Sequence, residues 1–116
     1  MGDRGNIAIK QDVKTKDDEP VYIYFYSHWT GSELPVILQR ALQRGRNRWG
    51  DEAYLNRIIF SEMISDAVMD ETGYGISTSL GDNGNEIIYV DHEALNVTIG
   101  EKSWSFEEYL TAKIKE

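Results

Sequence analysis

The chain of 116 residues carries a formal net charge of −8 and contains no cysteine. Its length and its hydrophobic fraction of 41% predict a single globular domain whose core needs no metal or disulfide to hold it together. The composition excludes disulfide frameworks, thiolate nucleophiles and cysteine-ligated zinc, and the acidic charge argues against non-specific binding to nucleic acid.

The first two predicted elements are strands. Apolar and polar residues alternate over residues 7–13, and "VYIYFY" (residues 21–26) places aliphatic or Phe side chains on one face and tyrosines on the other. The charged segment "KTKDDEP", which ends at Pro20, connects the two runs. Together they predict an N-terminal hairpin.

Two central helices are predicted next. Apolar residues recur at helical spacing over residues 33–44 and again over residues 52–68. We expect Ser32 to cap the first helix and Gly45 to end it. Asp51 is expected to cap the second helix, because its side chain can accept a hydrogen bond from the first turn.

The second predicted helix is apolar over most of its circumference, because Leu55 and Ile58 lie off its main apolar arc. The tyrosine face of the second strand adds further apolar surface. One helical layer covers only one face of a sheet, so we expect a homo-oligomer, most simply a two-fold dimer. Such a dimer could place Arg46 or Arg48 against the 28–33 loop of a neighbour. In the alternative, the C-terminal helix covers the second face within a monomer.

The C-terminal part of the chain returns to a period of two. An Asn-Gly turn signal in "GDNGNE" separates residues 74–80 from residues 87–91 and predicts a hairpin. Residues 95–99 and 103–106 predict two further strands, and residues 106–116 predict a short helix. The fold class is therefore α+β: a single domain, residues 1–116, with a mainly antiparallel sheet, made of the N-terminal hairpin and a C-terminal meander, two central helices and the short C-terminal helix.

A candidate site for an anion lies in the loop "HWTGSELP". Its polar residues run into a helix N-terminus, where free N–H groups and the helix dipole favour a phosphate or carboxylate. Four of the six arginines fall within residues 40–48 and could clamp a second phosphate. The predicted ligand-binding residues are His28, Trp29, Thr30, Gly31, Ser32, Arg44, Arg46 and Arg48. In the alternative, the tryptophans are core anchors and the arginines pair with the acidic surface.

Catalytic and metal-binding patterns are sparse. His28 has Ser27 and Thr30 nearby, but the sequence lacks a G-x-S-x-G elbow, so a structural or capping role is favoured and no catalytic residue is assigned. The second histidine, His92, belongs to "DHE" (residues 91–93), and adjacent side chains in a turn rarely converge on one ion. We therefore expect no metal and no cofactor.

Four blocks of the sequence, in the order "MGDRGNI", "HWTGSELP", "RWGDEAYLNRIIFSEM" and "ETGYGIS", resemble a group of short uncharacterised proteins of bacterial and phage genomes. The resemblance runs from the first residues to about Val90 and implies no activity, cofactor or partner. By analogy, small acidic phage proteins are often accessory factors. No membrane span or signal peptide is recognisable, so we expect a cytoplasmic protein.

Three functions are compatible with these patterns. The first is a non-enzymatic binding protein that holds or sequesters an anionic, nucleotide-like molecule. The second is an acidic inhibitor or adaptor that binds a host protein through its negative surface. The third is a small hydrolase that uses His28.

Overall fold

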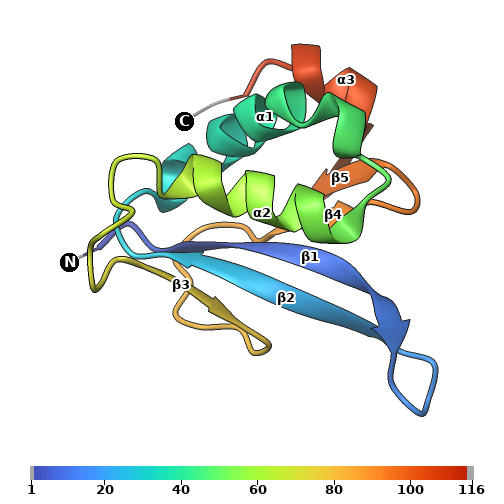
Figure 1. Cartoon of the computed structure of the whole chain (residues 1–116), viewed down its shortest axis with the longest axis horizontal. Coiled ribbons are helices and arrows are strands. Elements are labelled where there is room, and N and C mark those ends of the chain that lie inside the picture. The colour runs from blue at the N-terminus through green and yellow to red at the C-terminus, as the bar shows by residue number, and fades with distance from the viewer. Residues whose placement is uncertain (1, 115–116) are drawn as a thin grey trace.

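The sheet of the molecule contains six strands within residues 2–114, which are the residues that the computed structural model describes (Figure 1). These strands are β1 (Gly5–Lys14), β2 (Pro20–Ser27), β3 (Tyr74–Ser77), β4 (Ile88–Asp91), β5 (Asn96–Ile99) and β6 (Lys102–Ser105). The helices are α1 (Leu34–Arg44), α2 (Glu52–Met63) and α3 (Phe106–Thr111), with 3-10 turns η1 (Gly31–Glu33) and η2 (Arg46–Arg48) on either side of α1. Within this range, no helix is long and apolar enough to cross a membrane.

The strands are ordered β3-β2-β1-β4-β5-β6. β1 and β2 form an antiparallel hairpin in which Ile9 lies opposite Ile23, and β4, β5 and β6 form an antiparallel meander. β1 and β4 are parallel, with Ile7 opposite Ile88. A parallel pair requires a crossover connection, and here both central helices lie within that connection. The predicted α+β fold class is therefore confirmed, as a single compact domain.

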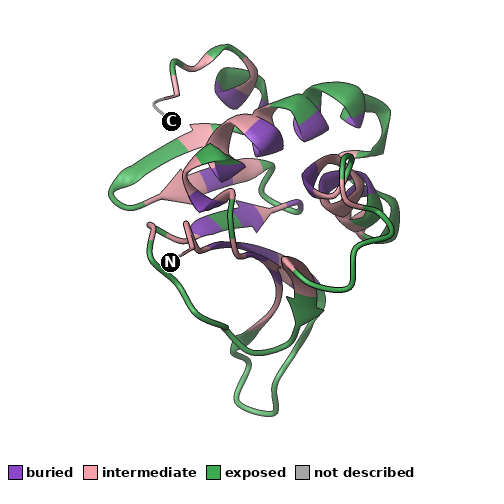
Figure 2. Cartoon of the chain, turned by 90° about the vertical axis from the view of Figure 1, so that its left-hand side faces the viewer, coloured by how far each residue is buried: buried purple, intermediate pink, exposed green. Residues whose placement is uncertain are grey.

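The hairpin predicted at the Asn-Gly turn is wrong. β3 pairs with the outer edge of β2 and β4 pairs with β1, so two strands separate the proposed hairpin partners. Residues 78–87 instead form a long loop that crosses the sheet face opposite the helices (Figure 2). Asn6 on β1 holds this loop, because its Nδ2 donates to the Asp82 carbonyl at 3.0 Å. Strand β4 gains more from this arrangement than from a local turn, since Ile88 and Val90 become fully buried beside β1.

The helix boundaries follow the sequence only in part. Asp51 caps α2 as predicted and accepts a hydrogen bond from the Tyr54 N–H at 3.2 Å. Ser32 does not cap α1, because it lies inside η1 and its hydroxyl donates to Asp3. α2 ends at Met63 rather than at Val68, and residues 64–66 form a turn.

Both Leu55 and Ile58 are buried within the single chain, at 0% and 8% exposure. The reason is that α2 packs against the sheet on one side and against α1 on another, so its apolar side chains are buried on two sides of the helix (Figures 1 and 2). These two residues therefore leave no apolar surface for a partner. Their position no longer supports the prediction of a dimer. A homo-oligomer stays a prediction.

The short C-terminal helix lies beside α1, on the same side of the sheet as the other helices (Figure 1). Tyr109 is completely buried there, and its hydroxyl donates to the Pro35 carbonyl at 2.6 Å. Gln39 on α1 donates to the carbonyls of Tyr109 and Ala112 at 2.8 and 2.9 Å. The alternative in which this helix covers the second sheet face is thus wrong. That face carries half-buried tyrosines, among them Tyr22, whose ring lies edge-on to Tyr89.

Candidate functional site

The N-terminal end of α1 is occupied by a carboxylate of the protein itself. Asp3 Oδ2 accepts hydrogen bonds from the Ser32 backbone N–H at 2.9 Å and from the Ser32 hydroxyl at 2.5 Å. Asn85 donates to the other oxygen of Asp3 at 2.9 Å. These bonds, first the one from the Ser32 hydroxyl, lower the pKa of Asp3 below its ordinary value. A carboxylate held in this way satisfies the donors that the sequence analysis had assigned to an external anion.

The rest of the predicted loop is tied to its neighbours. His28 Nδ1 lies 2.8 Å from the Tyr26 hydroxyl, and the His28 backbone N–H donates to the Gly73 carbonyl. The Thr30 hydroxyl is hydrogen-bonded to Ser27 at 2.6 Å. Trp29 is 54% exposed, lies edge-on to the His28 ring, and its indole covers Gly73. The loop therefore packs as a connector, with Trp29 as its exposed side chain.

His28 lacks the partners of a catalytic base. Among the side-chain hydrogen bonds of residues 2–114, its ring is paired with Tyr26 and with no Ser or Thr hydroxyl. Ser27 and Thr30, the two nearest candidates for a nucleophile, are bonded to each other. A nucleophilic triad needs a direct contact between base and hydroxyl, so the geometry gives the hydrolase hypothesis no support.

The predicted arginines lie at the opposite end of α1 from this loop. Arg44 Nε donates to Glu62 at 3.0 Å, and its Nη2 donates to the Ile58 carbonyl and to Ser61. Arg46 pairs with Glu107, and Arg48 lies over the Tyr54 ring at 5.2 Å. An eleven-residue helix is about 16 Å long, so one chain does not bring these arginines to residues 28–32.

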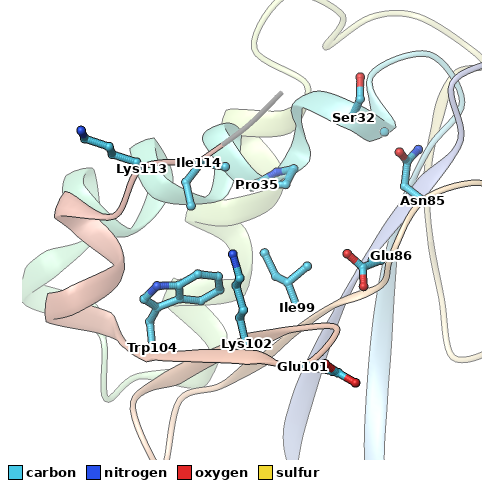
Figure 3. A pocket seen from close by; sticks show the side chains of 11 residues that line it. Ser32, Pro35, Asn85, Glu86, Ile99, Glu101, Lys102, Trp104, Lys113 and Ile114 are labelled. Carbon is cyan, nitrogen blue, oxygen red and sulfur yellow. The ribbon is translucent and has the colours of Figure 1, made fainter.

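A pocket of about 790 Å³ lies between the start of α1 and the β5–β6 hairpin (Figure 3). Two of the predicted residues, Gly31 and Ser32, belong to its wall. The other lining residues come from α1, the 78–87 loop, the hairpin and the C-terminal segment: Pro35, Asn85, Glu86, Ile99, Glu101, Lys102, Trp104, Lys113 and Ile114.

The basic and the acidic groups of this pocket lie at different ends. Figure 3 shows Lys102 rising from the hairpin next to Trp104, whereas Glu86 and Asn85 lie toward the start of α1. Glu101 points away from the cavity. Lys113, in the C-terminal segment, also extends its ammonium group away from the cavity. The pocket therefore offers an aromatic surface and one ammonium group, that of Lys102, at one end, and a carboxylate and an amide at the other.

Sequence reasoning missed most of these pocket residues. Trp104 and Lys102 lie in a short strand whose sequence shows only the alternation typical of strands. Nothing in the sequence shows that this strand faces the start of α1. The one usable signal was the "TGS" segment, which does reach the pocket wall through Gly31 and Ser32. Residues far apart in the chain meet here only because β4 joins β1 in the middle of the sheet.

No protein-family model matches the chain, and no curated protein and no solved structure matches it either. The likeness to short bacterial and phage proteins accordingly stays a prediction. The residues that line the pocket are therefore the basis for inferring its ligand.

Proposed function

We propose that the protein is a non-enzymatic binding protein that holds a small, anionic, nucleotide-like molecule in the pocket between α1 and the β5–β6 hairpin. The observation that carries this proposal is the pocket itself. Its volume of about 790 Å³ lies within the range of about 300–1,000 Å³ that is typical of small-molecule sites. Apolar side chains line much of it, and a few polar groups converge from different elements.

The chemistry of the walls supports a ligand with a flat ring and an anionic group. Trp104, Ile99 and Pro35 provide an apolar surface against which a ring could lie. Lys102 supplies a cation for a phosphate or carboxylate. Glu86 can accept hydrogen bonds from an amino group, which a simple inorganic anion would not offer.

The proposal differs from the sequence prediction in where the anion lies. Asp3 already fills the N-terminal end of α1, and Arg44 is paired with Glu62. Lys102 of the hairpin takes the role that the sequence predicts for the arginines. Gly31 and Ser32 keep a role as wall residues.

The test is calorimetry and thermal shift with a panel of cyclic and linear nucleotides. Binding should weaken about 10-fold or more in Lys102→Gln, because this variant loses a hydrogen bond to a charged group. It should change little in Lys113→Gln, because the Lys113 ammonium points away from the cavity. Lys16→Gln is the matched control, since Lys16 is exposed in the β1–β2 loop, away from the pocket. Equal affinity in all three variants would place the anion elsewhere. Absence of any binding across the panel would remove the nucleotide proposal.

A further inference from the structure

Four potential metal ligands from three distant segments converge at the end of the sheet opposite the pocket. Asp12 lies near the C-terminal end of β1, Glu52 begins α2, and His92 with Glu93 follows β4. β1 and β4 are parallel neighbours, so their C-terminal ends meet at one edge, and α2 begins above that edge (Figure 1). The ligand atoms of Asp12, His92 and Glu93 lie within 4.8 Å of one another.

His92 is the buried member of this cluster. It is 5% exposed, and its Nε2 lies 2.8 Å from Asp12 Oδ1 and 3.7 Å from Glu52 Oε2. Nε2 nevertheless has no hydrogen-bond partner among residues 2–114, because Asp12 Oδ1 lies off the direction of an N–H at this atom and Glu52 Oε2 lies beyond hydrogen-bond distance. A buried ring nitrogen that faces carboxylates without bonding to them is costly unless a further group sits between them.

A metal ion accounts for these distances and for the misalignment. Two donors that bind one zinc ion at ~2.0–2.2 Å lie about 3–3.5 Å apart, and the measured 2.8 and 3.7 Å are close to this range. In such a site the ion lies on the lone-pair direction of the imidazole nitrogen, and the neighbouring oxygens necessarily lie to the side of it. A direct histidine–carboxylate hydrogen bond would instead place the oxygen on that direction.

We propose that His92, Asp12 and Glu93 bind a divalent first-row transition-metal ion, with Glu52 available as a fourth donor. An imidazole combined with carboxylates suits zinc, manganese or iron(II) better than the all-oxygen sites of calcium and magnesium. Glu52 is also held in place, because its carboxylate accepts the Asp12 backbone N–H. This proposal departs from the sequence expectation of no metal, since two of the donors come from segments about 40 and 80 residues away from the "DHE" turn.

Calorimetric titration of tag-free protein with zinc chloride tests the site. Asp12→Asn and Glu93→Gln should each weaken zinc binding about 10-fold to 100-fold, and His92→Gln should abolish it. Asp17→Asn is the control, because it removes one carboxylate from the exposed β1–β2 loop and leaves the cluster intact. Melting curves without zinc show that each variant is folded. Wild-type affinity in Asp12→Asn and Glu93→Gln would overturn the proposal.

Nitrogen NMR of the two histidine rings gives a second and independent readout. The chain has two histidines, and His28 serves as an internal reference because its ring is bonded to Tyr26. Zinc should move the Nε2 resonance of His92 and leave both His28 nitrogens in place. If zinc moves neither ring, His92 contacts Asp12 directly and the metal site is rejected. Equal shifts of both rings would indicate non-specific binding and would reject it as well.

Discussion

Asp3 Oδ2 accepts two hydrogen bonds from Ser32, one from the backbone N–H at 2.9 Å and one from the hydroxyl at 2.5 Å. The Asp3 carbonyl also accepts the Gly31 N–H at 2.7 Å. The start of the chain is thereby tied to the turn that begins α1. The sequence predicts a binding site for an external anion at this turn. In the structure, the carboxylate of Asp3 occupies that site.

Asp3→Asn should lower the melting temperature at neutral pH, because an amide oxygen accepts these hydrogen bonds less strongly than a carboxylate does. The hydrogen bonds lower the pKa of Asp3 below its ordinary value of 3.8. The stabilisation is therefore complete above that value and is lost as the pH falls toward the lower pKa of the folded state. Melting curves between neutral and acid pH should show the two proteins converging. A constant difference at all pH values would contradict this assignment.

The local parts of the fold were accessible from the sequence. The alternation of 21–26 predicts β2, and Asp51 marks the start of α2, because each signal depends on neighbouring residues alone. The parallel pairing of β1 with β4 was not accessible. Ile7 and Ile88 are more than eighty residues apart along the chain, and the Asn-Gly turn between β3 and β4 favoured a hairpin that tertiary burial overrides.

The candidate sites were hidden for the same reason. Gly31 and Ser32 were recognisable as a helix-initiating segment, but Lys102 and Trp104 join them only through the strand order. The sequence neighbours of His92 argue against a role of this residue as a metal ligand. Its closest carboxylates, Asp12 and Glu52, are brought to it by the β1–β4 pairing and by the position of α2.

Tyr109→Phe should destabilise the protein by about 0.5–1.5 kcal/mol, because it removes the hydrogen bond that the Tyr109 hydroxyl donates to the Pro35 carbonyl. Burial raises the pKa of Tyr109 well above its ordinary value of 10.0. The unfolded chain then releases this proton at a lower pH than the folded protein, so stability falls as the pH rises above about 10. Urea unfolding across this range should show a smaller alkaline loss in Tyr109→Phe than in the wild type. An unchanged alkaline slope would show that Tyr109 is not responsible.

Leu55→Ala should lower the free energy of unfolding by about 2–5 kcal/mol, since the side chain is fully buried and its removal leaves a cavity. Light scattering should give the same mass for the wild type and for this variant. Ala53→Ser, on the exposed side of the same helix, is the control and should change stability little. A change of mass in Leu55→Ala would instead place Leu55 in an interface between subunits.

Gly73→Ala should cost about 1–3 kcal/mol, because Gly73 has a φ of +100° that a residue with a side chain rarely adopts. An added Cβ would also lie 2.4 Å from the Trp29 ring. Tryptophan fluorescence should therefore change together with the melting temperature. Gly75→Ala is the matched control, because a Cβ at this position meets no atom within 4 Å. Similar stability of both variants would show that the turn adapts without strain.

Two substitutions test what the arginines of residues 44–48 contribute to stability. Arg44→Gln removes donors from Glu62, Ser61 and the Ile58 carbonyl, and should lower the free energy of unfolding by about 1 kcal/mol. Arg48→Gln loses its position over the Tyr54 ring and should change stability by less than about 0.5 kcal/mol.

Neither arginine substitution should alter nucleotide affinity, because the pocket lies at the other end of α1. Calorimetry on both variants, with Lys102→Gln measured in parallel, separates the two locations of the anion. A loss of affinity in Arg48→Gln with an unchanged melting temperature would mean that a neighbouring subunit brings its arginines to the pocket. That result would restore the shared site and, with it, the dimer that the sequence predicts.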